Sequence, residues 1–143
     1  MREQHINEPT FDNINESLML AQEDCFKTID FNTVKQEDLA FISQYKNKIS
    51  YDGELNGFAI WYGVWFSLNH VDIYLDGSPY NDKKIFSQLM IYLKNKTNVK
   101  KGDLVWGSIA FRNSPADKYK SELKISANLE ERKYKTIQYY TIE

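Results

Sequence analysis

Apolar and polar residues alternate along much of this chain, and a period of two is typical of a β-strand with one buried face. The alternation is clearest at Leu123, Ile125, Ala127 and Leu129, which are separated by single polar residues. Aromatic and β-branched residues reinforce the same pattern elsewhere. Further strands are therefore expected over residues 25–31, 39–50, 54–68, 85–93, 104–111 and 134–142.

The segment 54–68 is the strongest predicted strand because it is apolar on both faces. One face carries Phe58, Ile60, Tyr62, Val64 and Phe66, and the other carries Ala59, Trp61 and Trp65. Such a strand is usually covered on both sides. We expect a hydrophobic core on one side and a partner domain on the other. Trp61 and Trp65 could instead stack a sugar or a base, but packing in the core or between domains is the favoured interpretation.

Polar segments between these strands predict turns and loops. The Asp52-Gly53 pair marks a turn, residues 69–84 and 113–120 are expected to be loops, and the lysine-rich stretch 94–101 is expected to be a solvated hairpin loop. Near the N-terminus, apolar residues at helical spacing predict a short helix within residues 12–22. Asp12, Asn13 or Asn15 would be its N-cap.

The composition favours one β-rich domain. The chain has 143 residues, enough for a single core, and 15% of them are aromatic, which suits pleated, half-buried surfaces. No internal repeat is visible. The predicted class is all-β and mainly antiparallel, either a β-barrel or a two-sheet sandwich, with a short N-terminal helix.

Charge and hydropathy exclude several classes of protein. The net charge is −2 and the basic residues are scattered, so no direct nucleic-acid binding is expected. No apolar run reaches the ~18 residues of a membrane span, and no signal-peptide core is visible. We expect a soluble protein of the cytoplasm, the nucleus or both, without membrane binding. The single cysteine, Cys25, excludes an internal disulfide and is expected to be a buried, inert thiol.

Candidate catalytic groups are few. His5, His70 and Cys25 lie far apart in the sequence and match no metal-ligand spacing. Neighbouring carboxylates at residues 37–38 and 130–131 would point to opposite faces of a strand, so they are interpreted as solvated surface. No glycine-rich phosphate loop is present. The residues alone predict no catalytic, cofactor-binding or metal site.

Several short motifs nevertheless occur in a distinctive order. The stretch ELNGFAIWYGVWFS (54–67) is followed by GSPYNDKKIFSQLMIYL (77–93) and VKKGDLVWGSIAFRNS (99–114), and NEP (7–9) and CFKTIDFNTVKQED (25–38) precede them. In this order and spacing the chain resembles the C-terminal β-barrel domain of the protein arginine N-methyltransferases. The resemblance covers nearly the whole chain. The matching positions are 57–66, 78–80, Gln88, Val99, Gly102, Gly107, Ile109 and Asn113.

The resemblance implies that the chain is a C-terminal portion of such an enzyme. Residues 1–24 would be a polar lead-in with a short helix after the family's dimerisation arm, and residues 25–143 would be the barrel domain. Enzymes of this family bind S-adenosylmethionine on an N-terminal Rossmann-like domain. We therefore expect no cofactor in this portion, and S-adenosylmethionine in the full-length protein. The implied partners are that domain, a second copy in a homodimer, and Gly/Arg-rich protein substrates.

One barrel motif of this family contacts the active site: a Thr-His-Trp loop that precedes a Gln-containing strand. Counted from Gln88, its three positions fall on Lys84, Ile85 and Phe86, after a three-residue insertion. Phe86 could replace the tryptophan, but Ile85 cannot replace a histidine that moves protons. Tyr80, Lys84, Ile85 and Phe86 are therefore the substrate-side loop candidates implied by the resemblance.

Three hypotheses stay open at this point. The chain could be the accessory barrel of an arginine methyltransferase, with Trp61, Trp65 and the 78–86 loop on its working surfaces. It could instead be a non-catalytic β-sandwich module that binds a glycan or a peptide. The isoleucine at position 85 also motivates a third hypothesis, a pseudoenzyme subunit that activates an active paralogue.

Overall fold

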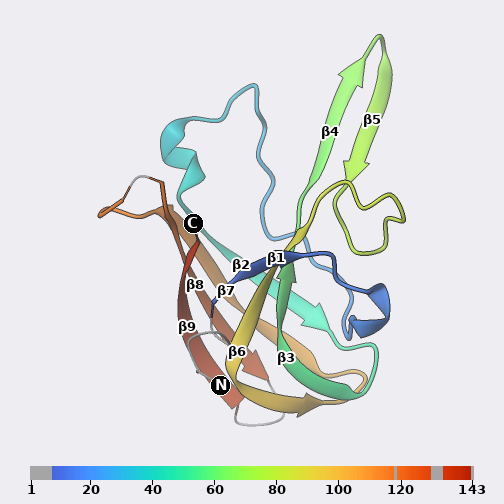
Figure 1. The fold of residues 1–143 in the computed structure, drawn as a ribbon, viewed down its shortest axis with the longest axis vertical. Helices are drawn as coiled ribbons and strands as arrows, with labels where there is room; N and C mark the ends of the chain where they lie inside the picture. Colours follow the sequence, from blue (N-terminus) through green and yellow to red (C-terminus); the bar gives the residue numbers. More distant parts are fainter. Residues whose placement is uncertain (1–7, 118, 130–133, 143) are drawn as a thin grey trace. The chain divides into compact units, whose positions relative to one another are not determined.

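The structure is a computed structural model that describes residues 8–117, 119–129 and 134–142. Within these ranges the chain forms nine β-strands and two short 3₁₀ helices (Figure 1). Every strand pair with a determined register is antiparallel, so the predicted all-β, mainly antiparallel class is confirmed. The elements are β1 (Thr10–Asp12), η1 (Glu16–Leu18), η2 (Gln36–Leu39), β2 (Phe41–Lys48), β3 (Gly53–Ile60), β4 (Gly63–Leu68), β5 (Val71–Asp76), β6 (Gln88–Val99), β7 (Leu104–Asn113), β8 (Ser121–Leu129) and β9 (Tyr134–Ile142).

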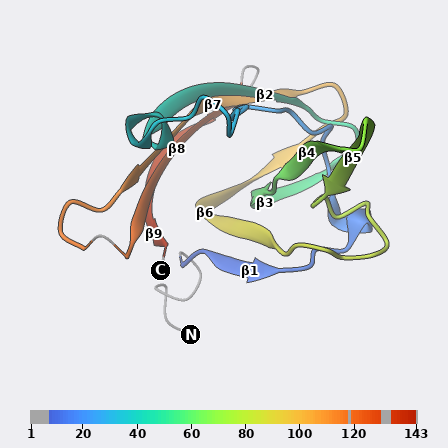
Figure 2. The same cartoon turned by 90° about the horizontal axis from the view of Figure 1, so that it is seen from above.

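The strands are arranged in three sheets. A four-stranded sheet has the order β2-β7-β8-β9, and Figure 2 shows β2 and β7 as neighbouring ribbons. A three-stranded sheet has the order β1-β6-β3, and β4 pairs with β5 as a separate hairpin. The chain therefore combines local pairings, such as β8 with β9, with a pairing of β2 and β7 that joins distant parts of the sequence.

The chain divides into two compact units, and each unit is built from two separate segments. Unit 1 consists of Met1–Met19 and Gly57–Leu93, and unit 2 consists of Leu20–Asn56 and Lys94–Glu143. β3 and β6 each begin in one unit and end in the other. The boundary expected between residues 24 and 25 stays a prediction.

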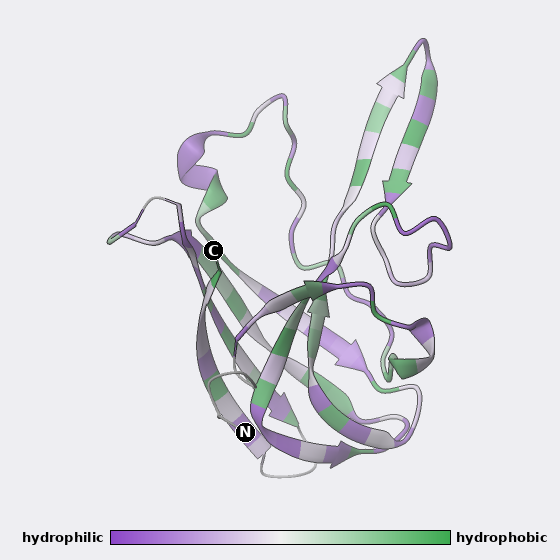
Figure 3. Cartoon of the chain, viewed as in Figure 1, coloured by the Kyte–Doolittle hydropathy of each residue, from purple (hydrophilic) through white to green (hydrophobic). Residues whose placement is uncertain are grey.

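The core of unit 2 lies on one face of the four-stranded sheet. Leu123, Ile125, Ala127 and Leu129 are each at most 3% exposed, so the predicted alternation along β8 is confirmed. The register places Val105 and Ile109 of β7 opposite Leu129 and Ile125, and these residues are equally buried. Figure 3 shows hydrophobic and hydrophilic residues alternating along these strands.

The core of unit 1 centres on the first half of β6. Leu89, Ile91 and Leu93 are buried there, and the polar Gln88 at the start of the strand is also fully buried. A buried amide needs hydrogen-bond partners, and the Gln88 amide has them on both its nitrogen and its oxygen.

The strand predicted at residues 25–31 is not present. No strand pairing involves these residues, and the hydrogen bonds that this part of the chain makes to β2 come from residues just before them. The backbone N–H of Gln22 donates to the Lys48 carbonyl oxygen (3.1 Å), and Asp24 Oδ2 accepts from the Lys46 N–H (2.8 Å). The prediction of a buried thiol is also wrong, since Cys25 is exposed.

The long strand predicted at residues 54–68 is interrupted. β3 ends at Ile60 and β4 begins at Gly63, so Trp61 and Tyr62 lie in the break. The predicted loop 69–84 is also shorter than expected, because its first part is β5. Residues 71–76 fit the pattern of a strand through Val71, Ile73 and Leu75, which alternate with more polar residues.

Two other predicted segments differ in extent. Residues 94–99 of the lysine-rich stretch continue β6, because Val99 at the end of the strand is buried while the lysines stay at the surface. The turn is confined to residues 100–103, where Gly102 has a φ of 97°, a value that favours glycine. The N-terminal helix is a single 3₁₀ turn, η1, whose N-cap Asn15 accepts a hydrogen bond from the Ser17 N–H.

Candidate functional site

The β4–β5 hairpin of unit 1 is largely exposed. Asn69 and His70 form its two-residue turn with φ values of 52° and 65°. Two successive residues with positive φ are what a tight hairpin turn requires, and asparagine tolerates this region better than most residues. His70 is therefore a turn residue, and the hairpin turn accounts for its positive φ.

One face of this hairpin is wholly apolar. The register pairs Val64 with Leu75, Phe66 with Ile73, and Leu68 with Val71. Phe66, Leu68 and Val71 are 43%, 58% and 60% exposed. We call this apolar ladder the hairpin face. An isolated two-stranded hairpin is marginally stable in water, so the hairpin face is suited to burial against another surface.

The two tryptophans of this region have different environments. Trp65 is 70% exposed on the other side of the hairpin, and its ring stacks on Tyr74 with 4.4 Å between ring centroids. Trp61 is half-buried in the break between β3 and β4. The expected shared face on one continuous strand is therefore not present, because the break separates the two residues.

The loop between β5 and β6 is held by hydrogen bonds around Asp76. The Asp76 carboxylate accepts from the Ser78 N–H and from Ser78 Oγ, both at 2.9 Å. The Asp76 carbonyl oxygen accepts from Asn81 Nδ2 at 2.6 Å, and the Lys83 N–H donates to Asn81 Oδ1. Asparagine and aspartate side chains often fix turns in this way. The loop thus has a defined conformation despite its polar sequence.

The Gln88 side chain holds the two ends of this loop together. Its Nε2 donates to the carbonyl oxygens of Gly77 (2.9 Å) and Phe86 (3.2 Å), and its Oε1 accepts from the Ile14 N–H (2.9 Å). The buried amide is therefore satisfied on both ends. It links the two ends of the loop to the segment that follows β1.

Gly77 lies at a close approach inside the loop. A Cβ at this position would meet the carbonyl oxygen of Tyr62 and the ring of Phe86. The two aromatic rings pack on each other with 4.7 Å between centroids. The loop is therefore pressed against the break between β3 and β4, and only glycine fits at its first position.

The four substrate-side candidates all lie on this ordered loop. Tyr80 is 44% exposed and Ile85 is 42% exposed, whereas Phe86 is half-buried against Tyr62. Lys84 has a φ of 49°, and its Nζ donates to the Pro79 carbonyl oxygen (2.8 Å). The structure thus brings the four residues onto one loop, with Tyr80 and Ile85 presented to solvent. Their role at a substrate site stays a prediction.

A concave feature lies within unit 2. An open groove of about 440 Å³ is lined by Asp24, Gln44, Tyr45, Lys46, Leu104 and Trp106. The sequence pattern does not reveal this groove, because its residues come from segments up to about eighty positions apart. The only sequence signal was the aromatic residue at position 106, which is 44% exposed.

Metal-binding clusters of ionisable residues are absent from the described part of the chain. No group of three or more histidine, cysteine or acidic side chains there could hold a metal ion. His5 lies outside the described residues, as do Glu130 and Glu131. In the ranges covered by the structure, no helix is long and apolar enough to cross a membrane.

The shifted ionisable groups are core tyrosines of unit 2. Burial raises the pKa of Tyr140 to about 12, with a further contribution from Tyr134. Burial also raises the pKa of Tyr45, whose hydroxyl donates to the Ser126 carbonyl oxygen at 2.6 Å. Tyr45 and Tyr140 both belong to the buried core, and Tyr45 is also one of the residues that line the groove.

Comparison with solved structures defines the class of fold. The chain superposes with a TM-score of 0.91 on a chain of the Trypanosoma brucei PRMT1 enzyme-prozyme heterotetrameric complex with AdoHcy, covering 98% of this chain and 45% of that one at 18% identity. Arabidopsis thaliana protein arginine methyltransferase 10 gives a TM-score of 0.90 at 18% identity, covering 99% of this chain and 44% of that one. The fold is thus that of the β-rich C-terminal domain in arginine methyltransferase structures.

The sequence comparisons identify the family. Residues 1–132 match the model of the arginine methyltransferase oligomerization subdomain, and the chain belongs to this family. Protein arginine N-methyltransferase 1 of Dictyostelium discoideum is 23% identical over 87% of this chain and 36% of its own length. The Caenorhabditis elegans protein of the same name is 28% identical over 87% of this chain and 35% of its own length. The chain spans about a third of the length of these relatives.

Proposed function

We propose that this chain is the C-terminal barrel of an S-adenosylmethionine-dependent protein arginine N-methyltransferase. In this proposal the loop of residues 77–87 forms one wall of the groove for arginine-containing substrates. The observation that carries the proposal is the anchoring of both ends of this loop by Gln88, on a loop that exposes Tyr80 and Ile85. A wall of this kind positions a peptide, and positioning is a large part of catalysis in group transfer.

The described residues do not fit a binding site for the methyl donor. They contain no glycine-rich turn after a strand. In the loop, the acidic residue closest in sequence to the exposed Tyr80 and Ile85 is Asp82, and it is followed by Lys83. The donor and the carboxylates that hold a guanidinium would therefore belong to a Rossmann-like domain of the full-length protein. The hairpin face is our candidate for the surface that packs against that domain.

Methyl transfer to a Gly/Arg-rich peptide by the full-length protein tests this proposal. With labelled S-adenosylmethionine, Tyr80→Ala should raise KM for the peptide, because it removes part of the groove wall. Ser67→Ala, on the hairpin and outside the loop, is the matched control and should leave KM unchanged. A full-length protein that transfers methyl groups with equal KM in both variants would contradict the substrate-wall role.

A second candidate function is a pseudoenzyme subunit that forms an oligomer with an active methyltransferase. Ile85 favours it, because an aliphatic side chain at the position of the family's histidine cannot exchange protons. The Trypanosoma brucei relative is described as an enzyme-prozyme complex, so oligomers of unlike subunits occur in this fold. Full-length protein that is inactive alone but raises the activity of a co-purified methyltransferase would favour this candidate. An active homodimer would contradict it.

A further inference from the structure

Strand pairing gathers basic residues that are scattered in the sequence onto one face of the four-stranded sheet. Residues directly opposite each other in an antiparallel sheet share a face, as do residues two positions apart on one strand. One row across the sheet runs Lys46, Trp106, Asn128 and Lys135, and another runs Ile42, Ala110, Lys124 and Tyr139. We call this face, opposite the buried side of β8, the outer face.

The outer face combines exposed rings with exposed cations. Tyr139 is 72% exposed and Trp106 is 44% exposed. Lys124 places its ammonium 5.5 Å from the centroid of the Tyr139 ring, so a cation stands directly beside an aromatic surface. The basic residues of the face are Lys46, Lys48, Arg112, Lys124 and Lys135.

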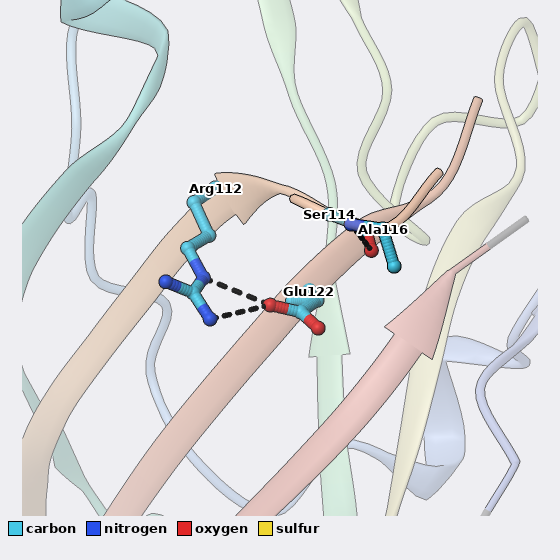
Figure 4. Close-up of polar contacts among 4 residues, drawn as sticks. All are labelled: Arg112, Ser114, Ala116 and Glu122. Carbon is cyan, nitrogen blue, oxygen red and sulfur yellow. Dashed lines mark hydrogen bonds and ion pairs between the residues drawn. The ribbon is translucent and has the colours of Figure 1, made fainter. Parts of the chain in front are cut away.

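Acidic side chains on this face are already engaged. Glu122 forms an ion pair with Arg112 at 2.8 Å, drawn in Figure 4. Asp24 borders the groove beside Trp106, and its Oδ2 accepts from the Lys46 N–H. Among the residues that the structure describes, five cations therefore face two acids here, although the whole chain has a net charge of −2. This local excess of positive charge attracts a polyanion.

The groove supplies the concave part of the same face. Trp106, Gln44 and Lys46 lie at neighbouring positions of β2 and β7 and line it together with Asp24, Tyr45 and Leu104. Its volume of about 440 Å³ accommodates a planar base against the indole ring, and Gln44 offers a donor and an acceptor to the base edge. An acidic peptide would satisfy the lysines but would leave the two aromatic surfaces without a planar partner.

We propose that the outer face binds single-stranded nucleic acid, with a base stacked on Trp106 in the groove and phosphates held by Lys46, Lys124 and Lys135. Exposed aromatic rings that stack bases, set among cations that hold the backbone, are the usual features of such sites. The inference departs from the expectation drawn from the sequence, where the same lysines are far apart. It is independent of the proposed role in methyl transfer.

Fluorescence anisotropy of a labelled twelve-nucleotide oligouridine, titrated with the 143-residue chain at 50 mM salt, tests the proposal. Trp106→Ala should weaken binding about tenfold or more, and Trp106→Phe should retain most of the affinity because it keeps a ring. Trp65→Ala is the matched control, since it removes a more exposed indole from unit 1, and it should have no effect. Each variant is first compared with the parent chain by circular dichroism, so that misfolding is not scored as lost binding.

Salt dependence and competitors give a second readout. The logarithm of the binding constant should fall against the logarithm of salt concentration with a slope of about −2 for three phosphate contacts. The double variant Lys124→Gln/Lys135→Gln should reduce the magnitude of this slope by about 1.4. The DNA oligomer of the same sequence should also bind. The proposal is overturned if no binding occurs at 50 mM salt or if Trp106→Ala binds like the parent chain. Equal competition by a poly-glutamate peptide of the same charge would also overturn it and would indicate an acidic protein segment as the occupant.

Discussion

Gln88 Nε2 donates to the carbonyl oxygen of Gly77 across 2.9 Å, and this bond joins the two ends of the loop that carries the substrate-side candidates. The same amide binds the Phe86 carbonyl oxygen and the Ile14 N–H. One fully buried side chain thus satisfies three backbone groups. It therefore anchors both ends of the loop.

Gln88→Leu should lower the free energy of unfolding by about 3 kcal/mol, because buried backbone groups would lose their partners while the side-chain volume is nearly kept. Urea denaturation of the chain measures this change. Gln44→Leu is the matched control: the same substitution at an exposed position of β2 should change stability by less than about 0.5 kcal/mol. Equal effects of the two variants would contradict the anchoring role.

Gly77→Ala should destabilise the chain by about 2 kcal/mol, because the added Cβ meets the Tyr62 carbonyl oxygen and backbone must shift. Thermal unfolding followed by circular dichroism measures the loss. Ser87→Ala, at an exposed position of the same loop, should have little effect. In the full-length protein, Gly77→Ala should also raise KM for peptide, if the loop is the groove wall.

The exposed hairpin face should make the isolated chain self-associate weakly. Leu68 and Val71 pair at its end and are both more than half exposed, so burying them is favourable by about 25 cal/mol per Å² of apolar area. Replacing both by lysine should shift sedimentation towards the monomer without loss of fold. Ile42→Lys is the control, because Ile42 is 76% exposed and lies on the four-stranded sheet, outside the hairpin face. It should leave the sedimentation unchanged. A concentration-independent monomer for the parent chain would contradict this prediction.

Alkaline pH should unfold the chain through its buried tyrosines. The pKa of Tyr140 is about 12 in the folded state, compared with about 10 for an exposed tyrosine, and the pKa of Tyr45 is also raised. Between these pH values the unfolded state releases protons that the folded state keeps. Stability is therefore fully present below pH 10 and falls as the pH rises towards 12, by up to about 1.4 kcal/mol per pH unit for each tyrosine.

Urea midpoints measured from pH 8 to pH 11.5 check this pH dependence. Tyr140→Phe removes one ionisable hydroxyl and should make the loss above pH 10 less steep. Tyr139→Phe is the matched control, because Tyr139 is the neighbouring residue and is 72% exposed, and it should leave the slope unchanged. A parent chain whose stability is constant up to pH 11.5 would contradict the raised pKa values.

The parts of the fold that sequence predicted well are those with simple alternation. β7, β8 and β9 lie close to their expected ranges, because each pairs with a chain neighbour and buries every second residue. The segment 54–68 was predicted as one strand because its residues all favour β structure. Its interruption depends on the loop that packs Phe86 against Tyr62, a contact that local patterns cannot reveal.

The candidate site could be predicted only in part for a similar reason. The family resemblance placed Tyr80, Lys84, Ile85 and Phe86 near a functional surface, and the structure gathers them on one ordered loop. The role of Gln88 as the anchor could not be deduced, because its three partners are spread from residue 14 to residue 86. The outer face was also invisible in the sequence, since it depends on the register of four strands.

The division of each compact unit into two segments has a consequence for biosynthesis. β2 lies in the first segment of unit 2, and its partner β7 leaves the ribosome more than fifty residues later. At about 5–20 residues per second, the nascent chain carries an unpaired β2 edge for several seconds. During that interval unit 1 can already assemble from its own two segments. The order of synthesis therefore favours early maturation of the loop and hairpin, and leaves β2 unpaired until β7 has been made.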